Sequence, residues 1–470
     1  MALLRVQRLR RAPLLVPLLL SSACLSVPDL GPRPEPRAPE TFATTFDAPS
    51  ADWPADRWWE RYGDPQLATL IGEGLAGSPT MAIAEARVRR AQANAQQAGA
   101  ALQPQIDATA SGGALQSSEN LGLPVAQGWE DYGQIALGLT FDLDLWGRNR
   151  ANLRAALSET DAARADAAYA RLTLSTAIAA SYADLARLAA LRDTANTNLR
   201  IREDTLRMMR AREDQGLENR AVVARAESNR ATAAAELAAV DEQIELIRNA
   251  IAALVGQGPD RGRTISLPAA ARLDAFGLPS GLGIDIVGRR PDIAAARLRA
   301  EAQAQRIHAA RAEFYPNVSL SALVGLQSLG IGNLLQGGSF FGSAGPAISL
   351  PIFSGGRIEG NYRGTRADYD VAVAAYDDTL ITALREVADV ATRQRALGVR
   401  LRESRAGLEA SATAHRLLEA RYRGGLASYL EVLSAEDALN SNRRAVAELE
   451  ASAFALDVAL VRALGGGFRS

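Results

Sequence analysis

Residues 134–145 read QIALGLTFDLDL, and apolar side chains occupy every second position without interruption. The apolar set is Ile135, Leu137, Leu139, Phe141, Leu143 and Leu145. Because side chains alternate between the two faces of a β-strand, this pattern predicts a strand with one apolar and one polar face. Asp142 and Asp144 fall on the polar face. The alternation stops at Trp146 and Gly147.

The segment after this strand predicts an unusually long helix. Residues 148–212 contain neither Pro nor Gly. At about 1.5 Å per residue, such a helix is about 98 Å long, whereas the usual helix has about 12 residues. Gly216 interrupts the pattern, and a second helix from Glu218 to about Leu254 is expected to return antiparallel, because a break of a few residues makes a helical hairpin.

The second half of the chain repeats these signals in the same order. They are Pro79, Pro104, Gly147 and Gly216 in the first half, and Pro291, Pro316, Gly356 and Gly425 in the second. The successive intervals are 25, 43 and 69 residues in the first half and 25, 40 and 69 in the second. This agreement indicates an internal duplication.

Each half is therefore expected to supply two strands and a loop between them. In the first half a strand begins at Gln105, residues 115–131 form the loop, and the second strand runs to Leu145. In the second half a strand begins at Asn317, residues 327–345 form the loop, and the second strand ends at Phe353. Helices are then expected over residues 357–421 and from Ser428 to about Leu464.

The N-terminus has the layout of a secretory signal. Four arginines precede the apolar run 14–20, and the small residues 21–23 precede Cys24, the only cysteine. A cysteine in this place resembles the acylation site of bacterial lipoproteins, although Ser21 stands where such a site usually has Leu. Cys24 is therefore predicted to carry palmitate, and the alternative is a plain cleaved signal. Leu25 follows Cys24 in place of Asp, which favours sorting to the outer membrane.

The same signals divide the chain into segments. Residues 1–23 are the predicted signal peptide, 24–56 a proline-rich lipidated tether, 57–254 the first structural repeat, and 255–290 an equatorial linker. Residues 291–464 are the second repeat and 465–470 the C-terminal tail. Asp64 is expected to cap a helix that begins at Pro65. No later window is apolar enough for a transmembrane helix.

Composition excludes several functions. The formal net charge of −1 argues against a nucleic-acid partner. All 52 basic residues are Arg, so a P-loop lysine or a Schiff-base lysine is impossible. The two histidines form no H-E-x-x-H motif, and no G-x-S-x-G elbow occurs. We therefore expect no enzymatic activity, no cofactor and no metal, and the alternation alone explains Asp142 and Asp144.

Four strands with one apolar face cannot stand alone in a membrane. Unpaired backbone groups at the sheet edges cost several kcal/mol each in hydrocarbon. About eight strands is the practical minimum for a closed barrel, so copies of the chain must complete it. Two copies would leave an interior just wide enough for side chains, and a conduit therefore favours three copies with twelve strands.

These stretches resemble the TolC-like outer membrane factors, specifically their NodT-type lipoprotein branch. The matching segments are WWERYGDPQLATLI (58–71), FDLDLWGRNRANL (141–153), residues 277–325, ISLPIFSGGRIEGNY (348–362) and RYRGGLASYLEVLSAEDAL (421–439). The resemblance implies an α+β membrane protein: a homotrimeric 12-stranded β-barrel continuous with a long α-helical barrel, plus an equatorial mixed region. It also implies a passive exit duct, fed by an RND-type or ABC-type inner-membrane pump through a periplasmic adaptor. The alternative is a non-conducting, periplasm-spanning coiled-coil protein of the envelope.

The resemblance further implies a closable periplasmic end. Many relatives read LLDAQR where this chain reads Leu433 to Asp437, so Ser434 stands at the position of the usual gate Asp. Leu430, Ser434, Glu436 and Asp437 are the candidate gate residues, with the two acids replacing the missing Asp. The other interpretation is that the two acids are ordinary solvated helix charges.

The two hairpin turns match each other, with Arg four residues before Gly and Leu directly after it. The matching residues are Arg212, Gly216 and Leu217 in the first turn and Arg421, Gly425 and Leu426 in the second. By resemblance, these turns border the grooves that receive the adaptor. Each Gly would also serve as a helix C-cap with Leu as its hydrophobic contact, and both roles are compatible.

Overall fold

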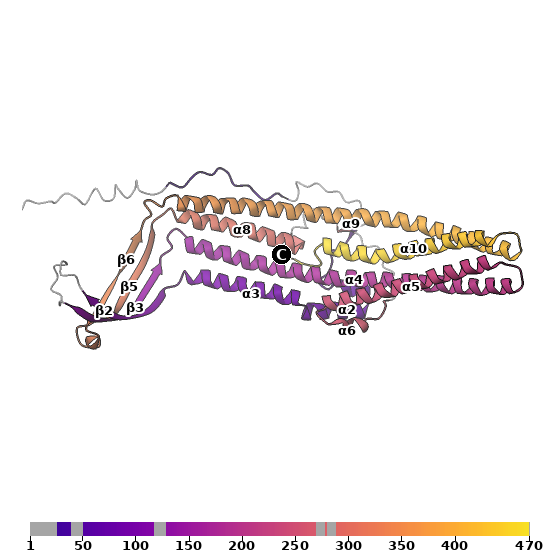
Figure 1. Ribbon diagram of the computed structural model, residues 1–470. Coiled ribbons are helices and arrows are strands. Elements are labelled where there is room, and N and C mark those ends of the chain that lie inside the picture. Colours follow the sequence, from indigo (N-terminus) through magenta and orange to yellow (C-terminus); the bar gives the residue numbers. More distant parts are fainter. Residues whose placement is uncertain (1–25, 39–49, 117–127, 269–277, 280–287, 470) are drawn as a thin grey trace, which may run out of the picture. The chain divides into compact units, whose positions relative to one another are not determined.

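The computed structural model describes residues 26–38, 50–116, 128–268, 278–279 and 288–469. The chain divides into two compact units, and several helices run through both. The first unit comprises residues 1–36, 88–163 and 296–376 and holds the sheet of four strands. The second comprises residues 37–87, 164–295 and 377–470 and holds the two helical turns (Figure 1).

The first unit is built on one antiparallel sheet. Its strands are β2 (Gln105–Gln116), β3 (Trp129–Asp142), β5 (Asn317–Leu329) and β6 (Phe340–Ser349), in the order β2-β3-β5-β6. The register pairs Leu137 with Ala108 on one side and with Val324 on the other. The apolar positions of β3 therefore continue across the sheet as a single face, and this face includes exposed side chains such as Leu137 (52%) and Phe340 (71%).

Strand β3 ends earlier than the alternation predicts. It stops at Asp142, where the prediction ran to Leu145. Asp144 instead adopts a positive φ of 48°, and its side chain accepts hydrogen bonds from the backbone N–H of Asn149 (2.8 Å) and Arg150 (3.0 Å). Asp144 is therefore a buried cap for the next helix and does not lie on the polar strand face, so that placement was wrong. Asp142 stays on the strand and pairs with Arg148 at 2.9 Å.

The loops between paired strands are shorter than expected. Strand β2 continues to Gln116, and β5 continues to Leu329, into the predicted loops. Strand β6 occupies residues 340–349, so the predicted strand to Phe353 was displaced by several residues. Strand β6 ends at Ser349, which pairs with Asn317, the first residue of β5. The Gly-rich and Ser-rich composition of residues 327–345 predicted a loop, but residues 340–345 all pair with β5.

Helices of equal length recur in the two halves. They are α3 (Pro79–Ala100) and α8 (Pro291–Ala312), with 22 residues each; α4 (Arg148–Asp214) and α9 (Arg357–Arg423), with 67 each; and α5 (Arg220–Leu254) and α10 (Tyr429–Ala463), with 35 each. The four hairpin helices follow one constant offset of 209 residues. The two long helices are confirmed, and each extends two residues beyond its predicted end. Within the described ranges, no helix has both the length and the apolar character needed to cross a membrane.

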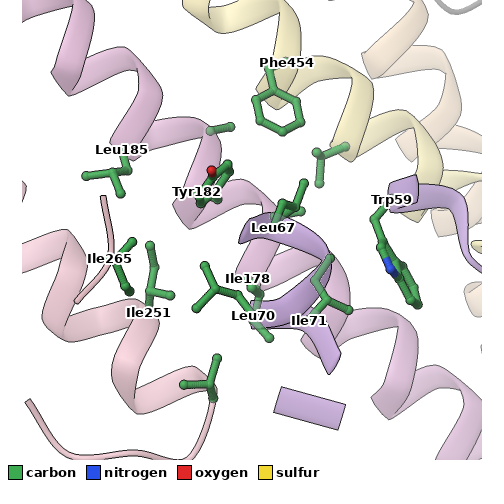
Figure 2. Close-up of a cluster of buried hydrophobic side chains, with 14 of the residues drawn as sticks. Trp59, Leu67, Leu70, Ile71, Ile178, Tyr182, Leu185, Ile251, Ile265 and Phe454 are labelled. Atoms are coloured by element: carbon green, nitrogen blue, oxygen red, sulfur yellow. The ribbon is translucent and has the colours of Figure 1, made fainter. Parts of the chain in front are cut away.

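The second unit contains an apolar core of side chains from both halves of the chain. The 3-10 helix η2 (Trp58–Tyr62) and helix α2 (Pro65–Gly77) pack against α4, α5 and α10, and Figure 2 shows Leu67, Leu70 and Ile178 at the centre. Full burial of such a side chain stabilises the fold by about 1.5–3 kcal/mol. Asp64 caps α2 as predicted, accepting from the N–H of Leu67 at 3.1 Å. A short helix, α6 (Pro259–Arg263), lies in the predicted linker, and strand β1 (Ser50–Ala51) pairs in parallel with β4 (Leu278–Pro279).

Residues 26–38 of the predicted tether form no helix or strand, and within them Gly31, Pro32 and Pro34 contact α9. Arg366 donates to the carbonyl oxygens of Gly31 (3.3 Å) and Pro32 (2.5 Å). The hydroxyl of Tyr369 donates to the Pro34 carbonyl at 3.1 Å. These contacts all belong to the first unit. They hold a proline-rich segment that has no helix or strand of its own.

Candidate functional site at the helical turns

The two helical turns have the same backbone geometry. Gly216 and Gly425 have φ values of 71° and 73°, a left-handed conformation that costs other L-residues roughly 1–2 kcal/mol. The N–H of Leu217 donates to the Arg212 carbonyl, and the N–H of Leu426 donates to the Arg421 carbonyl, both at 2.8 Å. The sequence spacing of Arg, Gly and Leu thus produces one helix-ending motif twice.

Arg212, in the first turn, is held by neighbours from both hairpins. Its guanidinium lies over the ring of Tyr422, 5.1 Å from the centroid, and its Nε is 3.7 Å from a carboxylate oxygen of Glu218. Tyr422 is buried, and its hydroxyl donates to the same Glu218 carboxylate at 2.9 Å. Burial and the Glu218 carboxylate raise the pKa of Tyr422 to about 12, so the phenol stays protonated. The side chain of Arg212 therefore packs between the two helical hairpins.

Arg421, in the second turn, has a different setting. Its side chain is exposed, and it donates to the carbonyl of Leu426 at 3.2 Å, within its own turn. The apolar residues beside the turns are also exposed, with 60% for Leu217, 72% for Leu426 and 53% for Leu430. Between the two turns lies a hollow of about 560 Å³, lined by Arg212, Glu218, Asn219, Ala221, Val222, Arg225, Tyr422, Gly425, Ala427, Ser428, Tyr429 and Leu430.

The candidate gate acids occupy two unlike places. Glu436 is buried at 3% exposure, and its Oε2 accepts from Arg202 Nη1 at 3.1 Å. Asp437 accepts from Nη2 of the same arginine at 2.5 Å, but 63% of its side chain is exposed. Burial raises the pKa of Glu436 above its ordinary value, and Arg202 only partly offsets that effect. Arg202 thus joins α4 to α10 through a forked ion pair, a geometry that suits its planar guanidinium.

The remaining gate candidates are on the surface. Ser434 and Leu430 are exposed, as is Asp437, whereas Glu436 faces the protein interior. A carboxylate buried against Arg202 within the chain is not a solvated helix charge. Of the two acids proposed to replace the missing gate Asp, only Asp437 faces solvent.

Sequence reasoning missed Arg202 and Tyr422. Arg202 lies 234 residues from Glu436, and nothing in the local pattern distinguishes it from the other arginines of α4. Tyr422 carried a weak signal, because the duplication places Glu213 at its counterpart position, so a buried aromatic side chain replaces a charged one. The predicted lipidation site, Cys24, lies outside the described residues. Among the residues that the structure describes, no group of three or more His, Cys, Asp or Glu side chains could hold a metal ion.

Comparison with known proteins places this arrangement in a family. The outer membrane efflux protein family matches residues 70–257 and 285–466. The fusaric acid resistance protein FusA of Burkholderia cepacia is 36% identical over 355 residues, which cover 72% of this chain and 66% of FusA. The multidrug resistance outer membrane protein MdtP of Shigella flexneri is 29% identical, covering 96% of this chain and 95% of MdtP.

A solved structure agrees with the fold. The outer membrane protein VceC of Vibrio cholerae superposes with a TM-score of 0.84 at 44% identity, covering 89% of this chain and all of VceC. The resemblance to TolC-like outer membrane factors is thereby confirmed. The description of the matching family names efflux and no catalytic activity. The chain belongs to the outer membrane efflux protein family.

Proposed function

We propose that three copies of this chain form the exit duct of a tripartite efflux system in the outer membrane. Each copy contributes four strands to a twelve-stranded barrel and four hairpin helices to a periplasmic tunnel. The duct is passive, and an inner-membrane pump of the RND or ABC type delivers the substrate through a periplasmic adaptor. The names of FusA and MdtP support toxic small molecules as cargo.

The observation that carries this proposal is the exposed apolar face of the sheet. Ile106, Leu137, Val324 and Phe340 lie on one face and are 43–71% exposed. The opposite face carries polar residues, among them Asp107, Thr140 and Ser321. Exposure of such an apolar face to water is unfavourable, whereas the lipids of a bilayer solvate it. In outer-membrane barrels, apolar residues that face the lipid alternate with polar residues that face the interior.

The sheet edges support assembly of several copies. Strands β2 and β6 each pair with only one neighbour within the sheet. Their outer backbone groups would be unsatisfied in hydrocarbon, so a second copy must pair with each edge. Closure by three copies leaves a wider interior than closure by two, because the barrel diameter grows with the number of strands.

The helices support a long periplasmic portion. Helix α4 begins six residues after β3 ends, and α9 begins eight residues after β6 ends. Each 67-residue helix is about 100 Å long at about 1.5 Å per residue. We assign the periplasmic gate to Leu430, Ser434 and Asp437 at the far end of these helices. The exposed turn residues Leu217, Arg421 and Leu426 are the proposed contacts of the adaptor.

The tether supports a lipid anchor at Cys24. Arg366 and Tyr369 fix the extended segment that follows the predicted cleavage site. A Cys24→Ser variant is expected to lose labelling by radioactive palmitate in cells while it still reaches the outer membrane. Palmitate labelling of the Cys24→Ser variant would contradict the lipoprotein assignment but would leave the channel proposal unaffected.

Conductance in planar bilayers tests the proposed function. The purified protein is expected to form small, cation-preferring channels, and Leu430→Ala or Asp437→Ala should widen them. Asp260→Ala is the matched control, because Asp260 is an exposed acid on α6 with a side-chain exposure of 95%. No current from any of these proteins would favour the non-conducting envelope protein. Unchanged conductance in both Leu430→Ala and Asp437→Ala would contradict the gate assignment but not the channel proposal.

A further inference from the structure

A cavity of about 400 Å³ lies in the second unit, where faces of three helices converge. Helix α4 contributes Ile201, Asp204, Thr205 and Met208, α9 contributes His415, Glu419, Tyr422 and Arg423, and α10 contributes Tyr429, Val432 and Glu436. On each helix the spacing is three or four residues and then seven, which places these side chains on one face. The cavity is therefore built by the helix packing and is not an irregularity of one loop.

Two buried polar atoms beside the cavity have no hydrogen-bond partner among the described residues. They are Oε1 of Glu436 and the hydroxyl oxygen of Tyr429. The side chain of Glu436 is only 4% exposed, and its second oxygen, Oε2, is already bound by Arg202. Buried polar groups in native proteins nearly always have a partner, so two unpaired atoms at one cavity point to a ligand that supplies donors.

The rest of the lining specifies the chemistry of that ligand. Ile201, Met208 and Val432 give an apolar wall, and Tyr422 and Tyr429 add two aromatic rings 6.1 Å apart. Asp204 and Glu419 are already engaged by Arg207 and Arg423. The lining thus combines one buried carboxylate oxygen with apolar and aromatic surface.

Other ligand classes fit less well. An anion would meet the Glu436 carboxylate, and a metal ion needs more oxygen ligands than a single free carboxylate oxygen offers. Burial lowers the pKa of His415 from its ordinary value, so the imidazole is neutral at neutral pH and does not repel a cation. A cation with an apolar body satisfies the carboxylate, the hydroxyl and the aromatic rings together.

We infer that this cavity binds a small organic cation, an amine that carries an aromatic or aliphatic body. Its ammonium group donates to Glu436 Oε1 and to the Tyr429 hydroxyl oxygen, and its apolar body lies against Met208 and the tyrosine rings. The site goes beyond the proposed duct function. It depends on side chains within one chain and not on conduction, so its failure would leave the channel proposal intact.

Binding of proflavine, a fluorescent aromatic cation, to the purified full-length protein tests this inference by fluorescence anisotropy. Displacement by 2-phenylethylamine is compared with displacement by 2-phenylethanol, which has the same ring and no charge. The variants are Glu436→Gln, which keeps an acceptor for Arg202, and Tyr429→Phe, which keeps the ring. Asp437→Asn is the matched control, because Asp437 binds the same Arg202 but does not line this cavity.

We expect proflavine to bind, the amine to displace it, and the alcohol to be at least tenfold weaker. Glu436→Gln should weaken binding about tenfold, since a hydrogen bond to a charged group is lost, and Tyr429→Phe should weaken it several-fold. Asp437→Asn should stay within twofold. Absence of binding, equal displacement by the alcohol, or equal losses in Glu436→Gln and Asp437→Asn would overturn the inference. Size-exclusion profiles and circular dichroism of each variant exclude misfolding as the cause of a loss.

Discussion

The turn at residues 215–219 and the turn at residues 424–428 share a backbone and differ in their side-chain contacts. Each has a glycine with φ near 70° and a Leu N–H bonded to an Arg carbonyl at 2.8 Å. Arg212 nevertheless lies over a buried aromatic ring, whereas Arg421 is exposed. Local sequence thus determines the turn, but contacts between the hairpins determine which arginine remains available to a partner.

The helices after the turns repeat this contrast. Glu227 on α5 and Glu436 on α10 are counterparts at the 209-residue offset. Glu227 forms an exposed ion pair with Arg210 at 2.6 Å, and Glu436 forms a buried one with Arg202 at 3.1 Å. An exposed pair contributes little to stability, whereas breaking a buried one leaves an uncompensated charge. The second hairpin therefore carries the more sensitive contacts.

The largest expected effect comes from Tyr422, which joins the two turns. Tyr422→Ala removes a buried ring, its hydrogen bond to Glu218 and the surface under Arg212. We expect a loss of about 3–5 kcal/mol, as for other buried aromatic truncations. Hydrogen exchange by mass spectrometry should show faster exchange in both turns. Leu426→Ala, at an exposed position, is the control and should leave exchange unchanged. Faster exchange in only one of the two turns of Tyr422→Ala would contradict a shared contact.

The glycines test whether the two backbones are equivalent. Gly216→Ala and Gly425→Ala each force a non-glycine residue into the left-handed region, at about 1–2 kcal/mol. No atom lies within 4 Å of the Cβ position at either glycine, so the backbone conformation alone accounts for the loss. Thermal unfolding of the two variants should give equal decreases. A clear difference would mean that the turns are not the same motif.

The two arginines should respond in opposite ways. Arg212→Ala is expected to destabilise the turns by about 0.5–1 kcal/mol, the lower range for a cation–π contact, because 33% of the Arg212 side chain is exposed. Arg421→Ala should leave stability unchanged and weaken binding of the adaptor, measured by surface plasmon resonance with the purified adaptor. Loss of adaptor binding in Arg212→Ala alone would reverse the proposed division of roles.

The smallest effect concerns pH. Burial raises the folded-state pKa of Glu436 above the ordinary value of 4.5. The folded state therefore binds a proton at Glu436 more tightly than the unfolded state does. The stabilisation from this proton is fully present below about pH 4.5 and is lost as the pH rises through the folded-state pKa. The difference in unfolding free energy between wild type and Glu436→Gln should fall from pH 4 to neutral pH. Glu227→Gln is the matched control, and its difference should show no such fall.

Periodic features were predictable from sequence, and contacts over long sequence distances were not. The strand alternation, the 67-residue helices and the glycine turns follow from local spacing, and the structure has them. The burial of Glu436 depends on Arg202, which is 234 residues away, so the local helix pattern around Glu436 does not indicate it. Asp144 fits the alternation, yet it caps α4 because Gly147 allows the chain to turn before Arg148.

The number of copies in the assembly tests the central claim most directly. The claim is that one chain supplies only a sector of a closed sheet, and that the edge strands β2 and β6 pair with strands of other copies. Native mass spectrometry of protein extracted from the outer membrane should give three protomers, with no stable monomer. A stable monomer, or a dimer with eight strands, would contradict the account.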